Sequence, residues 1–149
     1  MRGFISPAGE GKEHDALGMS IRLKAVSQDT AGVLEAMEGV FPPGLPFPAH
    51  THRKSDEVFY ILEGTMSTRV GERTGEESAG SFGFVPKGVV HGFENRGTSP
   101  ARLIVIQMPA PGVERMMDEL SALPPGPPDM EKLLPIMQKY DVVPEPPGS

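Results

Sequence analysis

Glycine and proline interrupt this chain so often that most of it has room only for short regular elements. The 149 residues include 18 Gly and 17 Pro, which favour turns and end helices and strands. Between them stand runs rich in β-branched and aromatic side chains, such as EVFYILEG (57–64) and ARLIVIQM (101–108). The run MSIRLKAV (19–26) alternates apolar and polar residues, which is typical of a half-buried strand. The pattern predicts an all-β fold, either a sandwich or a barrel.

One domain is expected from this length, in three parts. Residues 1–17 are weakly patterned and would form an N-terminal arm or an edge strand, and residues 18–111 would form the β barrel. Residues 112–149 form a Pro-rich, helical extension that we expect to pack on the barrel or on a neighbouring subunit.

The extension contains two helical patterns. VERMMDELSAL (113–123) has apolar residues at helical spacing, and MEKLLPIMQKY (130–140) follows Asp129, a typical N-cap residue. Pro135 predicts a kink or a break in the second helix, and the tail PEPPGS (144–149) is expected to fray. One earlier run, VLEAMEGVF (33–41), is compatible with either a strand or a helix.

Charge and composition exclude several classes of function. The net charge is −6 and the sequence contains no block of Lys or Arg, so neither a nucleic acid nor an anionic membrane is an expected partner. The lack of Cys excludes disulfides, thiolate zinc sites, iron–sulfur clusters and a cysteine nucleophile. Because no apolar run approaches 18 residues and the N-terminus lacks the apolar segment of a signal peptide, we expect a cytoplasmic protein.

Three of the four histidines fall into one pattern with a carboxylate. His50 and His52 are two residues apart, so on a strand they share a face, and Glu57 and His91 follow from later segments. Such a set of three imidazoles and one carboxylate suits a divalent first-row metal: Fe, Mn, Ni, Co, Cu or Zn. Four protein ligands leave a five- or six-coordinate metal with positions for a substrate.

The same residues are also compatible with purely structural roles. A single buried histidine is usually part of a core, and Glu57 has an alternative partner in Arg53 or Lys54 as a salt bridge. His14 lies outside the pattern and is expected to be exposed to solvent.

Glycines and prolines around these histidines carry a family resemblance. Residues 44–64 read G-x5-H-x-H-x4-E-x6-G, and residues 80–95 read G-x5-P-x-G-x2-H-x3-N. Both strings, with fifteen residues between them, resemble the paired motifs of the cupin superfamily. The resemblance implies a jelly-roll barrel, or double-stranded β-helix, with the metal bound inside by His50, His52, Glu57 and His91.

Turn geometry is expected to follow the same framework. Gly64, Gly71, Gly80 and Gly88 stand where strands must turn and where a positive φ favours glycine. Asn95 is expected to hold a turn through its side-chain amide rather than to take part in chemistry.

Strand alternation predicts which side chains line the pocket around the metal. In the strand expected over 101–108, we prefer the inward set of Leu103, Val105 and Gln107 over the set of Ile104 and Ile106. This choice leaves Gln107 as one polar group in an apolar cavity. Such a pocket favours a hydrophobic or aromatic small molecule. The expected pocket residues are Pro48, Phe59, Ile61, Val89, Phe93, Leu103, Val105 and Gln107.

Three hypotheses of function share this site. We favour a metal-dependent dioxygenase, because the chain resembles quercetinase-like monocupins, also over residues 109–129. In those enzymes the glutamate equivalent to Glu57 takes a proton from the substrate, so Glu57 is the expected catalytic residue. The alternatives are a metal-assisted polyketide cyclase or isomerase and a non-catalytic, ligand-binding cupin. A homodimer is expected, because cupin barrels commonly pair through sheet edges.

Overall fold

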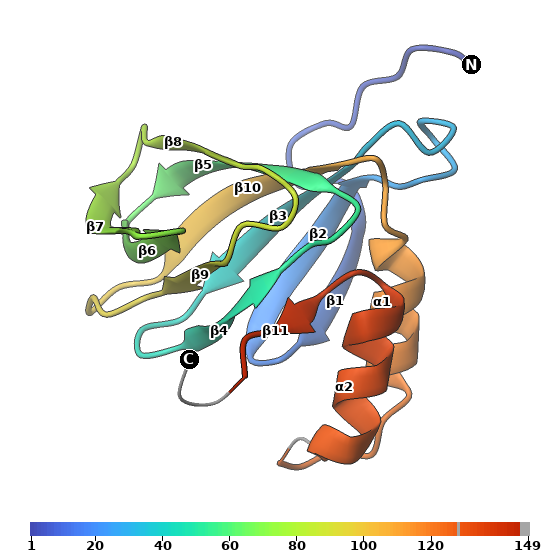
Figure 1. Ribbon diagram of the computed structural model, residues 1–149. Coiled ribbons are helices and arrows are strands. Elements are labelled where there is room, and N and C mark those ends of the chain that lie inside the picture. Colours follow the sequence, from blue (N-terminus) through green and yellow to red (C-terminus); the bar gives the residue numbers. More distant parts are fainter. Residues whose placement is uncertain (128, 147–149) are drawn as a thin grey trace.

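The structure, a computed structural model, describes residues 1–127 and 129–146. Within these ranges, two antiparallel sheets face each other and two short helices lie at one side (Figure 1). The strands are β1 (Lys12–Ala16), β2 (Met19–Ala25), β3 (Glu35–Phe41), β4 (Pro46–Thr51), β5 (Asp56–Glu63), β6 (Thr65–Val70), β7 (Arg73–Ser78), β8 (Phe82–Val85), β9 (His91–Glu94), β10 (Ala101–Met108) and β11 (Val143–Pro144), and the helices are α1 (Val113–Ser121) and α2 (Met130–Lys139).

The strand order explains how distant segments meet in one interior. One sheet has the order β1-β2-β3-β10-β5-β8 and the other β11-β4-β9-β6-β7. The all-β architecture predicted from the glycine and proline pattern is therefore confirmed. No helix among the described residues is long and apolar enough to cross a membrane.

Alternation along β5 and β10 builds the core between the sheets. Leu103 on β10 pairs with Ile61 on β5, and both side chains are fully buried. Met66 on β6 is equally buried, and Phe59 and Phe93 meet edge to face with ring centroids 4.9 Å apart. Burial of each such side chain contributes roughly 1.5–3 kcal/mol of stabilisation.

The expected turn glycines have the backbone geometry that their positions require. Gly64, Gly71, Gly80 and Gly88 all have positive φ. At Gly64 (φ 77) a Cβ atom would lie 3.0 Å from the Pro100 carbonyl oxygen, so a side chain there meets both strain and a clash with the backbone.

Asn95 holds a turn, as predicted. Its side chain is fully buried, and its amide nitrogen donates hydrogen bonds of 2.8 Å to the carbonyls of Phe41 and Ser99. Its carbonyl oxygen accepts the Gly97 N–H at 2.9 Å. The side chain therefore replaces backbone partners that this irregular segment lacks.

In two segments whose sequence patterns were ambiguous, the surrounding structure decides the secondary structure. The run 33–41 forms strand β3, because β2 and β10 pair with it on its two sides. Helix α2 is continuous through Pro135 instead of breaking there. Pro135 has no N–H to donate to the carbonyl of Glu131, one turn earlier in the helix. Both residues are exposed, so water can satisfy that carbonyl.

Both terminal segments contribute strands to the sheets. Residues 12–16, within the expected arm, form β1 and pair with β2. His14 lies on β1 with only 8% of its surface exposed, so the expectation of a solvent-exposed His14 is wrong. At the other end β11 pairs with β4, although fraying was expected there; residues 147–149 of that tail lie outside the described residues.

The extension packs against the barrel through its apolar face. Helix α1 buries Val113, Met116, Met117 and Leu120, and Asp129 caps α2 by accepting the Glu131 N–H, as predicted. The start of α1 has no side-chain cap of its own, because Gly112 stands there.

A carboxylate from β3 caps helix α1 instead. Glu35 is 2% exposed, and one of its oxygens accepts the N–H groups of Gly112 and Val113, both at 2.8 Å. Its other oxygen accepts the Ser27 N–H at 3.1 Å. A negative charge at a helix N-terminus satisfies free N–H groups and interacts favourably with the helix dipole. Glu35 therefore joins the extension to the barrel.

Glu35→Ala is expected to lower the free energy of unfolding by about 2–4 kcal/mol, because it leaves two buried N–H groups and one half-buried N–H group without an acceptor. Urea denaturation followed by circular dichroism measures this change. Glu72→Ala, at an exposed turn position, is the matched control and should stay within about 0.5 kcal/mol of the wild type. Equal stability of the two variants would show that Glu35 does not join the layers.

Candidate metal centre

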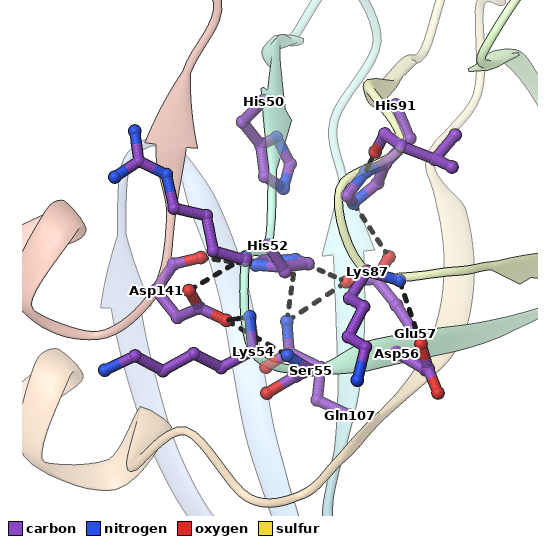
Figure 2. Close-up of polar contacts among 12 residues, drawn as sticks. His50, His52, Lys54, Ser55, Asp56, Glu57, Lys87, His91, Gln107 and Asp141 are labelled. Carbon is purple, nitrogen blue, oxygen red and sulfur yellow. Dashed lines mark hydrogen bonds and ion pairs between the residues drawn. The ribbon is translucent and has the colours of Figure 1, made fainter.

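Four side chains from three strand segments converge inside the barrel. His50 on β4 lies opposite His91 on β9, His52 follows the end of β4, and Glu57 stands on β5 (Figure 2). One potential ligand atom from each of these residues lies within 4.8 Å of the others. Their exposed fractions are between 0% and 4%. The structure thus brings together the four residues that the sequence pattern predicted as ligands.

Backbone carbonyls orient the three imidazoles. Nδ1 of His50 lies 3.0 Å from the Pro48 carbonyl oxygen, Nδ1 of His52 2.7 Å from that of Asp141, and Nδ1 of His91 3.1 Å from that of Val89. A carbonyl only accepts hydrogen bonds, so each Nδ1 carries the proton and donates it. In the neutral tautomer each Nε2 then has a free lone pair, which is how metal-binding histidines are commonly prepared.

Two buried polar atoms in this cluster have no hydrogen-bond partner among the described residues: Glu57 Oε1 and His91 Nε2, 3.4 Å apart. Glu57 Oε2 lies 2.9 Å from His52 Nε2. Lone pairs on a neutral imidazole and a carboxylate repel each other at this distance unless a proton or a cation lies between them. The donor set therefore fits a divalent cation bound by three nitrogens and one carboxylate.

The electrostatics of the cluster favour an ionised carboxylate. Burial by itself would raise the pKa of Glu57, but the nearby imidazoles of His52 and His91 outweigh it and hold that pKa well below its usual range. Burial also opposes protonation of His52, yet its hydrogen bond to Glu57 leaves its pKa raised. Burial, together with the charge of His91, lowers the pKa of His50 to about 3. The site therefore presents a negative carboxylate and, at His50, a neutral nitrogen to a cation.

The alternative partners considered for Glu57 are not beside it. The backbone N–H groups of Arg53 and Lys54 bind the carboxylate of Asp141 instead. Glu57 accepts a hydrogen bond from the Gln107 amide at 3.1 Å and faces inward from β5. The structural interpretation of Glu57 as a surface salt bridge is therefore wrong.

A cavity of about 90 Å³ lies next to the ligands. His50, His52, Glu57 and Gln107 are the polar groups at its wall, and nearly all of the remaining lining is apolar. Five methionines from the barrel and the helices line it: Met19, Met37, Met116, Met117 and Met137.

A wider groove of about 720 Å³ adjoins this cavity, and the two share Leu17, Phe47, His50 and Met137. The groove runs between the β1–β2 turn and the α1–α2 hairpin. Of the four candidate ligand residues, His50 lines both the groove and the cavity.

The expected pocket residues divide into several groups. Phe93, Val105 and Gln107 line the cavity. Phe59, Ile61 and Leu103 are buried in the core, and Val89 is half-buried against it. Burial of Leu103 and Gln107 supports the inward set on β10 that was preferred over Ile104 and Ile106.

Pro48 is exposed and lines the wider groove, and Phe47 takes the position in the cavity that was expected of Pro48. The cause is a bulge in β4: Phe47 pairs with Phe93 and His50 with His91, so β4 has one residue more than β9 between these pairs. An extra residue reverses the alternation, and Phe47 and His50 then face the same side although they are three apart.

Sequence reasoning missed Asp141, whose contacts with His52 and the following loop appear only in the folded chain. It also missed the helical methionines as cavity residues. Their helical spacing had indicated an apolar face, which is the signal that points to them.

Comparisons with known proteins identify a domain family and related folds. Residues 37–107 match the family model described as the cupin domain. An RmlC-like cupin from Shewanella frigidimarina NCIMB 400 superposes with a TM-score of 0.63 at 24% identity, over 73% of this chain and 93% of its own. The chain therefore contains a cupin domain. This cupin also has the jelly-roll fold that the resemblance implied.

Two further similarities involve polyketide proteins. The cupin is 38% identical over 76 residues to the tetracenomycin polyketide synthase protein TcmJ of Streptomyces glaucescens, which covers 50% of this chain and 49% of TcmJ. The polyketide cyclase RemF from Streptomyces resistomycificus superposes with a TM-score of 0.60 at 24% identity, over 72% of this chain and 79% of its own. The chain spans between 14% and 63% of the length of the curated relatives that it matches.

His91→Ala is expected to abolish metal binding, because it removes a fully buried ligand atom. Bound metal stabilises only the folded protein, by about 2.7 kcal/mol at a concentration of 100 Kd. Added Zn²⁺ should therefore raise the Tm of the wild type by roughly 5–10 °C and leave that of the variant unchanged. Metal content per chain, measured by elemental analysis, should fall from about one to near zero.

His14→Ala is the matched histidine control, since His14 lies on β1 and outside the cluster. Its burial allows a lower Tm without metal, but the shift on adding Zn²⁺ should equal that of the wild type. An equal loss of this shift in both variants would contradict the ligand assignment.

Proposed function

We propose that this cupin is a metal-dependent enzyme that acts on an apolar, aromatic small molecule. The observation that carries the proposal is the cluster of three histidines and Glu57, with unpartnered ligand atoms, at the wall of an apolar cavity. A metal site with protein ligands on one side and an apolar hollow on the other suits catalysis on a hydrophobic substrate.

The methionines that line the cavity support a substrate that is flat or variable in shape. Thioether side chains are flexible and make favourable contacts with aromatic rings. Three of the five cavity methionines come from α1 and α2, so the extension forms much of the wall that such a ring would touch.

Gln107 supports a substrate that carries a hydroxyl group. Its side-chain nitrogen lies 2.9 Å from His52 Nε2 and donates to Glu57 Oε2, while its carbonyl oxygen is buried without a partner among the described residues. A buried, unpartnered acceptor costs about 1–3 kcal/mol. A hydroxyl donor on the substrate would remove that cost and set the orientation of the ring.

The chain's own groups have distinct roles in this proposal. A divalent metal held by His50, His52, Glu57 and His91 would supply Lewis acidity and open coordination positions. Glu57, which lines the cavity, would accept a proton from the substrate. Gln107 holds the Glu57 oxygen that does not face His91. The apolar walls exclude water from the reacting groups.

Two reaction classes share this site. The first is dioxygenation, in line with the resemblance to quercetinase-like monocupins. The second is metal-assisted cyclisation or isomerisation, which the similarities to the polyketide synthase protein TcmJ and to the polyketide cyclase RemF support. A non-catalytic, ligand-binding cupin is the third outcome of the test. The homodimer expected from the sequence stays a prediction, which light scattering tests.

Oxygen consumption separates the classes. Protein loaded in turn with each candidate metal is mixed with a flavonol, and in a second series with an aromatic 1,3-diketone in D₂O under anaerobic conditions. Oxygen uptake matched to flavonol loss identifies a dioxygenase. Deuterium exchange beside the carbonyl or ring closure without oxygen identifies the cyclase class.

Glu57→Gln, measured at saturating metal, should lower either activity by about 10²-fold or more, because it removes the proton acceptor. Metal binding with neither activity for any metal would contradict the enzymatic proposal. It would favour a binding protein.

Gln107→Leu is expected to abolish discrimination between phenol and toluene, which have nearly the same shape. The wild type should bind phenol about tenfold more tightly, which corresponds to one hydrogen bond. Titrations followed by ligand-detected NMR measure both affinities. Gln138→Leu, an exposed amide on α2, is the matched control and should bind like the wild type; loss of discrimination there too, or its survival in Gln107→Leu, would refute this role.

A further inference from the structure

We propose that Asp141, at the end of the helical extension, is a positioning residue of the metal centre. It lies 89 positions after His52 in the sequence and outside the matched cupin domain, residues 37–107. Its contacts nevertheless fix both the orientation of His52 and the loop that joins His52 to Glu57. This inference rests on the proposed metal site.

The first contact sets the His52 ring. The backbone carbonyl of Asp141 accepts the His52 Nδ1–H at 2.7 Å, the shortest of the three imidazole–carbonyl contacts in the cluster. With Nδ1 engaged, His52 turns Nε2 toward Glu57 and Gln107 (Figure 2). A hydrogen bond of this kind fixes the tautomer of a ligand histidine and increases its basicity.

The second set of contacts fixes the loop after His52. The Asp141 carboxylate accepts the backbone N–H groups of Arg53, Lys54 and Ser55 at 2.9, 2.9 and 3.2 Å. Figure 2 shows this carboxylate beside the loop, on the side of His52 away from His91. Three charge-assisted bonds from consecutive residues hold the short connection between two ligands in one conformation.

The surroundings of Asp141 hold the residue in place. Only 7% of its surface is exposed, and its N–H donates to the Gln138 carbonyl at the end of α2. Its φ of 67 is a left-handed conformation that Asp, Asn and Gly adopt more readily than other residues. Immediately afterwards β11 pairs with β4, where Pro144 lies opposite His50.

The extension is thereby linked to the ligands at two points. Asp141 contacts His52 and its loop, and β11 lies beside His50. Met137 and Val142, which flank Asp141, line the cavity. The same segment therefore shapes the substrate wall and orients a metal ligand.

Two variants separate the carboxylate from the backbone. Asp141→Gly keeps the left-handed conformation and the carbonyl but removes the carboxylate. Asp141→Asn keeps the conformation and one acceptor oxygen. Asp118→Asn is the matched control, because Asp118 is an exposed aspartate on α1 that pairs with Lys12. All variants are made in the full chain.

Zn²⁺ affinity, measured by competition with a chelator at a temperature where each metal-free variant is folded, is the main readout. We expect a 10–100-fold loss for Asp141→Gly, which is typical when a residue that orients a metal ligand is removed. The Zn²⁺ affinity of Asp141→Asn should lie between that of Asp141→Gly and that of the wild type, and the affinity of Asp118→Asn should match that of the wild type. The visible spectrum of bound Co²⁺ should change in Asp141→Gly, because it reports ligand geometry.

The outcomes distinguish this inference from the proposed metal site. If Asp141→Gly unfolds more easily but binds Zn²⁺ with wild-type affinity and an unchanged Co²⁺ spectrum, Asp141 has only a structural role and the inference is overturned. If the wild type itself binds neither metal, the metal site and the inference both fail. Weaker binding with an altered spectrum supports both.

Discussion

The buried charge of Glu57 is the constraint on which the rest of the interior depends. A carboxylate removed from water needs partners close to it, or it loses its charge. In this cupin His52, His91 and Gln107 surround it, and each comes from a different part of the chain. The barrel must bring β4, β5, β9 and β10 into register to within about an ångström for those contacts to exist. The strand pairings that oppose His50 with His91 and Glu57 with Gln107 do so.

The helical extension completes the interior that the barrel strands leave open. One end of the barrel contains the ligands, and α1 and α2 cover that side with an apolar face while Asp141 holds the loop behind His52. Glu35 joins the first helix to β3, and β11 joins the end of the second to β4. Packing and polar contacts thus act together, because the helices are too short to be stable alone.

Much of the fold and the clustering of the four candidate ligands could be predicted from local pattern. Period-2 alternation, turn glycines and the spacing of His50, His52, Glu57 and His91 are properties of short segments. The pocket was harder, because it depends on register. A single bulge in β4 places Phe47 in the cavity position that was expected of Pro48. No residue in the segment PFPAHT indicates this bulge. His14 illustrates the same limit: an edge strand with little pattern buried a histidine that looked exposed.

The sequence by itself determined the all-β class, the turns and the chemistry of the ligands, because glycine geometry and the side chains' donor atoms act locally. Only the tertiary structure decided which apolar residues line the cavity, that Glu35 caps a helix far along the chain, and that Asp141 reaches His52. The Glu35 cap joins residues 77 positions apart, and the contact between Asp141 and His52 joins residues 89 positions apart. Their formation depends on how the sheets and helices pack, and nothing within a short window of sequence carries that information.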